Sequence, residues 1–312
     1  MATSIPPHNL GEVIDATMHL IDNPDATPDD LMNFVKGPDF PSGGNILGRA
    51  GIMDAYRTGR GSVKTRAKAV IEENRQGRME IQVTELPYQT SCSSIAARIV
   101  ELVDGGQLDG IADVNDNSSG GQTNLIITLK RDANSNVVMN NLFKLTQLQT
   151  SFPVNMVALV HGVPRTLNLR DALVGYVEHQ IEVTTRRSKF RLQKANDRNH
   201  ILEGRLKALN VIDKIIKLIR ESDDADAARK KLISNYKLSE IQANYILDMP
   251  LRRLTKFSRI ELEGEEKELK AIIAGLNKLL KDPEAVRTAV ADELKAQAKI
   301  FATPRKTRLG VK

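Results

Sequence analysis

The pattern of hydrophobic and polar residues in the second half of the chain predicts one very long helix. Between residues 168 and 221 there is no proline, and only Gly175 and Gly204 interrupt residues that favour helices. At 1.5 Å per residue, a helix over this range would be roughly 75–80 Å long, several times an ordinary globular helix. A helix of this length joins parts of a protein that lie far apart.

A second run of apolar residues predicts a partner for this helix. The spacing alternates between four and three, as in the seam of a coiled coil, at Leu262, Glu266, Leu269, Ile273, Leu276 and Leu280. On the long helix, apolar residues recur every seven positions at Ala195, Leu202, Leu209 and Ile216. We therefore predict that two helical arms pair as an antiparallel coiled coil within residues 168–302.

The segment between the two arms, residues 222–258, is too long for a hairpin turn and predicts a small helical globule at the tip. Ser239 is placed to cap one of its helices. Much of its apolar surface falls on Tyr245, Ile246, Met249, Pro250, Leu251 and Leu254. A unit of this size buries little apolar surface alone, so the pattern predicts a dimer interface. The alternative is that these residues close a small core within the globule itself.

The first half of the chain has a different pattern. Short alternating runs predict a hairpin from residues 62–72 and 78–86, and a second antiparallel pair from residues 110–114 and 124–129. Helical patterns lie before, between and after these strands. We therefore predict one mixed α/β domain over residues 11–167, which makes the fold class of the whole chain α+β.

The two ends of the chain are predicted to be extended. Pro6 and Pro7 hold residues 1–10 out of the helical region of backbone conformation. Residues 303–312 are basic, and their composition predicts a tail or a linker.

The formal net charge of +6 is concentrated on the long helix. Between residues 186 and 207, eight basic residues face only two acidic ones. Five of the basic residues have offsets of 0, 4, 7, 11 and 18, which predicts one shared helical face: Arg187, Arg191, Lys194, Arg198 and Arg205. Such a stripe is suited to neutralising the phosphates of a nucleic acid. The alternative is an ordinary solvated helix face.

A second basic segment, residues 56–66, combines glycines with basic side chains. Glycine lets the backbone approach a phosphate closely, and the candidates for a phosphate clamp are Arg57, Arg60, Lys64 and Arg66. An ordinary surface turn before a strand accounts for the same pattern equally well.

The sequence offers little for catalysis or metal binding. Its five histidines lack the spacing of metal ligands, and its single cysteine, Cys92, excludes an internal disulfide and fits a reducing cytosol. It contains no phosphate-binding glycine loop of the Walker type and no nucleophile elbow. No apolar run approaches 18 residues, so we expect a soluble, cytoplasmic protein without membrane contact.

Several segments resemble the A subunit of bacterial type IIA DNA topoisomerases, the family of gyrase and topoisomerase IV. They follow the family order along the chain: Met1-Ala2-Thr3-Ser4-Ile5-Pro6-Pro7-His8-Asn9-Leu10, Gly37-Pro38-Asp39-Phe40-Pro41, Ala55-Tyr56-Arg57-Thr58-Gly59-Arg60-Gly61, Glu85-Leu86-Pro87-Tyr88-Gln89, Asn155-Met156-Val157-Ala158-Leu159 and the segment from Gln242 to Thr255. As a set these matches are specific, but they leave gyrase and topoisomerase IV both open.

The resemblance implies a division of the chain into functional parts. Residues 1–10 would lead in from a winged-helix domain, 11–167 would be the tower domain, 168–302 the coiled coil, 222–258 the exit gate where two subunits meet, and 303–312 the linker to a C-terminal domain. Ile5 matches the isoleucine that wedges between base pairs of bent DNA. For Ile5 alone, the alternative is a loop residue packed against its own domain.

The resemblance also implies partners and cofactors. The expected partners are double-stranded DNA, a second copy of this chain, and a B subunit in an A2B2 complex. Mg²⁺ and ATP would be used by the complete enzyme through the B subunit, with no cofactor on this chain. The expected location is the bacterial cytoplasm, in association with the nucleoid.

One departure from the family pattern concerns catalysis. In this family a tyrosine preceded by arginine attacks the DNA backbone. The chain has five tyrosines, none of which follows an arginine: Tyr56, Tyr88, Tyr176, Tyr236 and Tyr245. We therefore expect a fragment that lacks the winged-helix domain and the catalytic tyrosine and is inactive alone. The alternative function is a non-catalytic coiled-coil dimer that binds and organises DNA.

Overall fold

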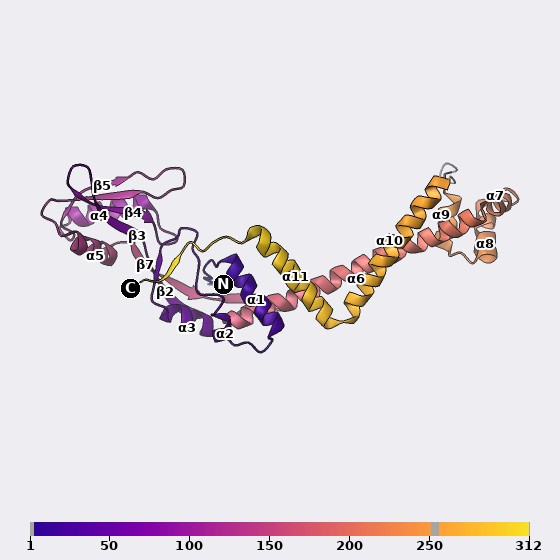
Figure 1. The fold of residues 1–312 in the computed structure, drawn as a ribbon, viewed down its shortest axis with the longest axis horizontal. Coiled ribbons are helices and arrows are strands. Elements are labelled where there is room, and N and C mark those ends of the chain that lie inside the picture. Colours follow the sequence, from indigo (N-terminus) through magenta and orange to yellow (C-terminus); the bar gives the residue numbers. More distant parts are fainter. Residues whose placement is uncertain (1–2, 251–255, 312) are drawn as a thin grey trace. The chain divides into compact units, whose positions relative to one another are not determined.

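The computed structural model describes residues 3–250 and 256–311, without the side chains of residues 256–258 and 311. The chain divides into two compact units (Figure 1). The first unit comprises Met1–Glu178 together with Ala291–Lys312, and the second comprises His179–Val290.

The first unit opens with helices whose ends follow local sequence rules. They are α1 (Leu10–Asp22), α2 (Pro28–Leu31) and α3 (Ala50–Thr58). The side chain of Asn9 caps α1 by accepting a hydrogen bond from the N–H of Glu12, and Thr27 forms a capping box with Asp30 ahead of α2. Gly59 ends α3 in the left-handed conformation, with φ at 80°.

A four-stranded mixed sheet shares a hydrophobic core with these helices. Its order is β10 (Arg308–Val311), β1 (Asn45–Leu47), β2 (Arg60–Arg66) and β7 (Gln149–Asn155), with β10 parallel to β1 and the other pairs antiparallel. The core is centred on Phe40, Ile46, Tyr56 and Val63. The basic C-terminal segment, for which composition predicts a tail or linker, therefore contributes a strand to this sheet.

A second four-stranded sheet in the same unit has its own core. Its order is β3 (Lys68–Glu73), β4 (Met79–Glu85), β6 (Leu125–Leu129) and β5 (Ile111–Asp116), all antiparallel. Helices α4 (Cys92–Asp104) and α5 (Ser135–Leu145) cover one face and share its core. The predicted run 62–72 divides at the buried Ala67 between the two sheets, and the N–H of Ala67 donates to the carbonyl of Leu148. The hairpin β3–β4 and the pair β5–β6 form as predicted.

In the described residues, the remaining regular structure consists of helices and one hairpin, β8 (Val157–Val160) and β9 (Val163–Thr166). The helices are α6 (Leu169–Asn210), α7 (Ile212–Arg220), α8 (Ala225–Tyr236), α9 (Glu240–Leu247), α10 (Lys256–Lys281) and α11 (Pro283–Phe301). Within the described ranges, no helix has the length and apolar character needed to cross a membrane.

The prediction of a single helix over residues 168–221 is wrong at Val211. The chain leaves the helical conformation at Val211, with φ at −129° and ψ at 30°, and this residue separates α6 from α7. Val211 packs against a core that contains Ala208 and Ile215. We attribute the break to this packing. Helix propensity does not predict it, because propensity takes no account of tertiary contacts.

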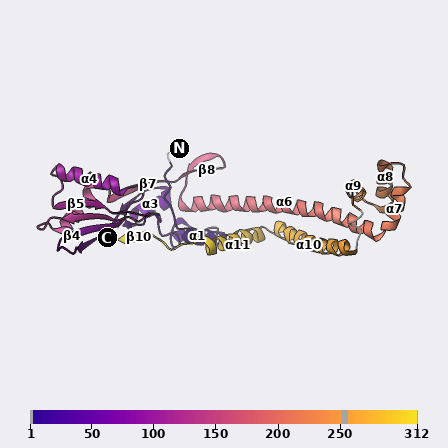
Figure 2. The same cartoon turned by 90° about the horizontal axis from the view of Figure 1, so that it is seen from above.

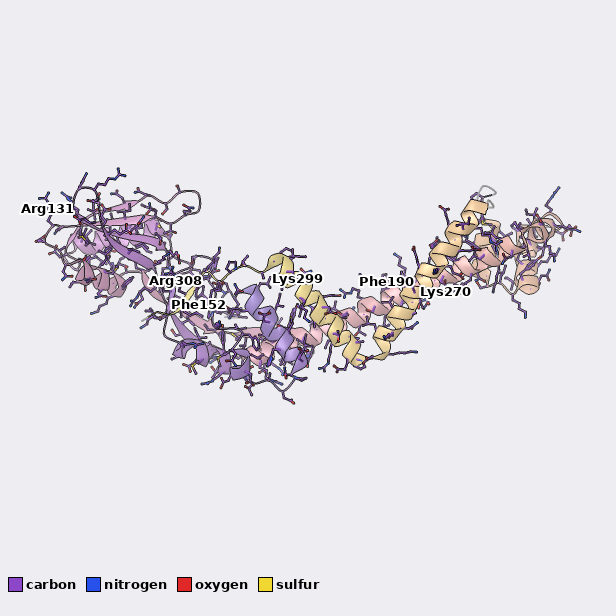
Figure 3. The ribbon with its side chains drawn as sticks, viewed as in Figure 1. Arg131, Phe152, Phe190, Lys270, Lys299 and Arg308 are labelled. Atoms are coloured by element: carbon purple, nitrogen blue, oxygen red, sulfur yellow. The ribbon has the colours of Figure 1, made fainter. Side chains whose placement is uncertain are left out.

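In the second unit, α10 lies alongside α6 and runs antiparallel to it (Figures 1 and 2). Arg198 of α6 pairs with Glu265, whereas Lys207, later on α6, shares a hollow with the earlier Arg259. The predicted seam positions are buried or half-buried: Leu262, Glu266, Leu269, Ile273, Leu276 and Leu280. Glu266, the polar member, is 2.7 Å from the Nζ of Lys270, which Figure 3 labels.

The helices between the two arms enclose a third core. Its buried members are Ala208, Ile215, Leu232, Leu238, Ala243 and Ile246. Gly204 of α6 permits a close approach of α9, because a Cβ at this position would lie 2.6 Å from Cγ of Gln242. The side chain of Gln242 in turn donates to the carbonyl of His200 over 2.6 Å. These contacts join α9 to α6 within the second unit.

Candidate nucleic-acid interface

The N-terminal segment presents an apolar side chain at the surface of the first unit. Ser4 and Asn155 form a two-way backbone bridge in which each N–H donates to the other carbonyl over 2.9 Å. Thr3 Oγ1 donates to the carbonyl of Val157 over 2.7 Å. Ile5 follows this bridge and is 52% exposed, whereas Pro6 after it is buried. About half of the Ile5 residue is therefore accessible at the surface.

Strand β2 brings two basic side chains to the neighbourhood of this segment. Asn155 pairs with Arg60 on one side and with Ser4 on the other, so these three residues form one row across the sheet. Two strand spacings of this kind amount to about 10 Å. Lys64 lies further along β2, and both basic side chains are exposed while Val63 between them is buried. We call Ile5, Arg60 and Lys64 the wedge surface.

The other two candidates for the phosphate clamp have partners inside the unit. Arg57 makes two hydrogen bonds to the carboxylate of Asp29, over 2.8 and 3.1 Å, which raise the pKa of Arg57. Arg66 donates twice to Oε1 of Gln149, and its guanidinium lies 4.4 Å from the ring centroid of Phe143. Burial lowers the pKa of Arg66. Of the four predicted clamp residues, Arg60 and Lys64 are thus exposed, Arg57 is exposed but paired with Asp29, and Arg66 is half-buried.

Behind Ile5, a buried pair fixes the backbone of the same segment. His8 Nδ1 lies 2.7 Å from the carbonyl of Pro6, and His8 Nε2 lies 2.7 Å from the hydroxyl of Tyr56. Burial lowers the pKa of His8 and strongly raises the pKa of Tyr56, so both are neutral near pH 7. Because a carbonyl only accepts, Nδ1 carries the proton of the neutral ring, and the hydroxyl of Tyr56 donates to Nε2.

On α6, the five residues of the predicted basic stripe do not share one solvent-facing surface. Arg191 and Lys194 are exposed, whereas Arg187 is half-buried. Arg198 makes two hydrogen bonds to the carboxylate of Glu265, over 2.6 and 2.9 Å. Arg205 is only 4% exposed, and its guanidinium lies 5.6 Å from the ring centroid of Tyr245.

The stripe has the spacing of a coiled-coil seam, with steps of four, three, four and seven residues, so a helix packed alongside can cover it. Spacing alone does not decide which residues are covered, because Arg191 and Lys194 share it and are exposed. The α10 and α9 helices occupy that side for Arg198 and Arg205, through Glu265 and Tyr245. Sequence reasoning missed Phe190, an aromatic side chain 70% exposed beside Arg191 (Figure 3). Its position off the seam spacing was the available signal.

The residues predicted for a dimer interface fall into three groups. Tyr245 is 39% exposed, and Pro250 is exposed with Met249 half-buried. Ile246 is buried in the core of its own unit, as the alternative explanation expected for the tip as a whole. Leu251 and Leu254 lie outside the described residues. Ile241 of α9, which the pattern did not single out, is 62% exposed.

Acidic, histidine and cysteine side chains do not gather into a metal site in the part of the chain that the structure describes. Tyr56 is fully buried against His8, and Tyr245 packs with Arg205. The chemistry that this geometry supports is binding, through exposed basic side chains and an exposed apolar residue.

Comparison with known proteins gives this surface a context. The family model for the A subunit of DNA gyrase and topoisomerase IV matches residues 1–295. The chain belongs to this family. It is 46% identical over 311 residues to the DNA gyrase A subunit of Streptococcus pneumoniae strain R6, and 48% identical over 310 residues to the corresponding gyrase protein of Staphylococcus aureus strain Mu50 and of Staphylococcus epidermidis.

These gyrase relatives are considerably longer than the chain. The alignments cover 99–100% of this chain but only 38% of the pneumococcal protein and 35% of the staphylococcal ones. The chain thus spans less than two-fifths of the length of the gyrase proteins it matches. The family membership confirms the resemblance on which the segment matches depend, while the roles of individual residues are a separate question.

Three polar residues behind the wedge surface escaped the sequence reasoning. Asp39, Arg305 and Thr307 link the segment after Ile5 to the C-terminal strand of the sheet. Asp39 lies within a segment that resembles the family, but its partners Lys306 and Thr307 are more than 260 residues away along the chain. No spacing rule connects residues so far apart, and only the parallel pairing of β10 with β1 brings them together.

Proposed function

We propose that the chain is the tower, coiled-coil and exit-gate part of the DNA breakage-reunion subunit of an ATP-dependent type II DNA topoisomerase. The observation that carries the proposal is that Ile5, Arg60 and Lys64 are exposed in the first unit of a chain that matches the gyrase and topoisomerase IV family over residues 1–295. Membership of this family favours the proposal over a non-catalytic coiled-coil protein that organises DNA.

The proposed division assigns a role to each part of the chain. Residues 1–10 lead in from a winged-helix domain, 11–167 form the tower, and 168–302 form the coiled coil with an exit-gate globule at 222–258. Residues 303–312 connect to a C-terminal domain. The antiparallel contact of α6 with α10 and the core shared by α7, α8 and α9 support the coiled coil and its globule.

On the wedge surface, the proposed roles follow from the chemistry of the side chains. Ile5 inserts between base pairs, where an apolar side chain unstacks a step and bends the duplex. Arg60 and Lys64 neutralise neighbouring phosphates and release their counterions. Because basic contacts carry no sequence information, binding at this surface is insensitive to base sequence.

The second unit is also proposed to make contacts through exposed basic and apolar side chains. Arg191 and Lys194 are exposed and meet the phosphates of a passing duplex. Tyr245, together with Met249 and Pro250, belongs to the contact between two copies, and exposed Ile241 adds apolar area on the same helix. A self-complementary patch of this kind gives a two-fold symmetric dimer.

The complete enzyme is proposed to be an A2B2 complex in which the B subunit binds Mg²⁺ and hydrolyses ATP. In the family, cleavage uses a tyrosine preceded by arginine, and none of the five tyrosines of this chain has that neighbour. The proposal therefore includes that these 312 residues bind and bend DNA without cutting it.

Replacement of the wedge residue tests this function. In a duplex labelled with a fluorescence donor and acceptor at its ends, binding of the unmodified chain should bring the ends closer. Ile5→Ala should abolish most of that change while weakening binding by less than about tenfold, because the basic contacts supply most of the affinity. Val70→Ala, an exposed apolar residue on the other sheet, is the matched control. Equal bending by the wild-type chain and Ile5→Ala would reject the wedge.

A further inference from the structure

Residues 303–307, which we call the C-terminal clamp, lie against the segment that follows Ile5. The side chain of Asn9 donates to the carbonyl of Thr303 over 2.9 Å. Arg305 donates to the carboxylate of Glu12, at the start of α1, over 2.6 and 2.8 Å. Both contacts lie within the first unit. The C-terminal clamp thus contacts residues 9 and 12, four and seven positions after the exposed isoleucine.

Asp39 connects the clamp to this segment directly. Its Oδ1 accepts hydrogen bonds from the N–H groups of Lys306 and Thr307, over 3.0 and 2.9 Å. Its Oδ2 accepts from the side chain of Asn9 over 3.1 Å, and its own N–H donates to the carbonyl of Pro7 over 2.9 Å. One aspartate therefore ties two residues of the clamp to two residues of the Ile5 segment.

The charge of Asp39 suits this connecting position. Burial alone would raise the pKa of Asp39, but the hydrogen bonds from Thr307, Asn9 and Lys306, with Arg305 nearby, outweigh burial and hold the pKa below its ordinary value. The carboxylate therefore remains a charged acceptor near neutral pH, and hydrogen bonds to a charged group are about twice as strong as neutral ones.

Within the C-terminal clamp, Thr307 is buried and Arg305 is half-buried, and both make further hydrogen bonds. Arg305 also donates to the carbonyls of Gly37 and Pro38, over 2.7 Å each. The hydroxyl of Thr307 accepts from the N–H of Phe40 over 2.7 Å and donates to the carbonyl of Gly43 over 3.2 Å. Residues 37–43 are thus held in place by the clamp, and Asp39 lies in the middle of them.

Ile5 is consequently anchored on both sides. On its N-terminal side, Ser4 is bridged to Asn155. On its C-terminal side, Pro7 is bonded to Asp39 and His8 to Tyr56. An exposed side chain that must enter a base step loses less entropy on binding when its backbone is already fixed.

We propose that Asp39, Arg305 and Thr307 are positioning residues for Ile5, and that the C-terminal clamp sets the orientation in which this side chain meets DNA. The proposal rests on the proposed role of Ile5 as a wedge. It assigns the C-terminal segment a part in DNA bending through its contacts with the segment that follows Ile5.

A tryptophan at position 5 provides a direct reporter, because the chain contains no other tryptophan. In an Ile5→Trp background, time-resolved anisotropy of the free protein measures how far the indole wobbles. We expect the indole to be restricted with the clamp intact and to wobble through a wider angle in Thr307→Val and Asp39→Asn. Thr307→Ser, which keeps the hydroxyl, should restore the restriction.

The chain offers a matched control in its other core. Thr146 is also buried, and its hydroxyl also accepts from a backbone N–H, that of Leu148, while it donates to the carbonyl of Leu142. Thr146→Val makes the same chemical change away from the clamp. It should lower the melting temperature about as much as Thr307→Val and leave the indole rigid. Similar wobble in the two variants, or a rigid indole in Thr307→Val, would overturn the positioning role.

The labelled duplex separates this inference from the proposed function. In the Ile5 background, Thr307→Val and Asp39→Asn should reduce DNA bending at least about threefold at saturating protein, with Thr146→Val unchanged. If Ile5→Ala removes bending but the clamp variants retain it, the positioning role fails and the wedge stands. If Ile5→Ala itself retains bending, the wedge fails, and the positioning proposal that rests on it falls too.

Discussion

The two units use basic side chains in different ways, although both carry them in patterns that suggest a nucleic-acid surface. On β2, Arg60 and Lys64 are exposed, and β7 lies between this strand and the segment that carries Ile5. On α6, Arg198 and Arg205 are engaged by Glu265 and Tyr245 within the helical unit. The number of basic residues in a segment therefore does not identify a nucleic-acid-binding surface. What decides is whether another element covers the face on which the charges fall.

The period of each element explains which face is covered. Along a strand, side chains alternate, and every second residue of β2 is free of the core that buries Val63. Along a helix, spacing by four and three marks the side that faces a partner helix. Arg191 and Lys194 share that spacing and are exposed, whereas the guanidinium groups of Arg198 and Arg205 contact Glu265 and Tyr245 of the neighbouring helices.

The largest expected effect comes from Arg205. Replacement by alanine removes a long side chain that is only 4% exposed and lies against Tyr245, so Arg205→Ala should lower the free energy of unfolding by about 2–3 kcal/mol. Urea unfolding followed by far-ultraviolet circular dichroism measures the change. The control is Lys207→Ala on the same helix, an exposed residue whose loss should cost less than about 0.5 kcal/mol.

DNA binding by Arg205→Ala further tests the difference between the two units. At a temperature where the variant is folded, its affinity for duplex DNA should stay within about twofold of wild type, because a buried guanidinium releases no counterion from DNA. A variant that keeps its stability but loses DNA affinity would show that Arg205 reaches the surface, and the distinction between the two units would fail.

Much of the local structure could be predicted from the sequence, because local rules determine it. The capping residue Thr27, the hairpin β3–β4 and the seam residues from Leu262 to Leu280 form as the pattern predicts. These features depend on neighbours within a few residues or on a repeating period. Helix propensity, strand alternation and capping therefore suffice for them.

The remaining features depend on contacts between distant segments. The break at Val211 follows from packing in the helical unit, and the division of strands at Ala67 follows from a hydrogen bond to Leu148. The pairing of β10 with β1 joins residues at opposite ends of the chain. The candidate site shows the same limit: Ile5 could be singled out through family resemblance, but its anchoring by Asp39 could not.

An intermediate effect is expected for the ion pair between Arg198 and Glu265. The bonds are short and bidentate, but both side chains are more than one-third exposed, so a double-mutant cycle with alanine should give a coupling of about 1 kcal/mol at most. A coupling near zero at neutral pH would indicate that solvent already screens the pair.

The pH dependence of this coupling has a definite sign. The hydrogen bond from Arg198, opposed in part by burial, lowers the pKa of Glu265 below its ordinary value of 4.5. The unfolded state therefore binds more protons than the folded state in this range, and the contribution is complete above about pH 4.5. It should be lost as pH falls through the lower folded-state pKa. The cycle repeated at pH 7 and pH 3 measures this loss, and a coupling that grows in acid would contradict the assignment.

The substitutions with the smallest expected effect on stability have a clear expected effect on the salt dependence of DNA binding. Lys64→Gln and Lys194→Gln each remove an exposed charge, so each should change the free energy of unfolding by less than about 0.5 kcal/mol. Each should also reduce the slope of log affinity against log salt concentration by about 0.9, the value for one phosphate contact. Arg198→Gln is the control, because its guanidinium is already paired with Glu265 and should leave the slope nearly unchanged. If Lys64→Gln lowers the slope and Lys194→Gln does not, only the sheet of the first unit contacts duplex DNA, and the exposed charges of α6 are a solvated helix face.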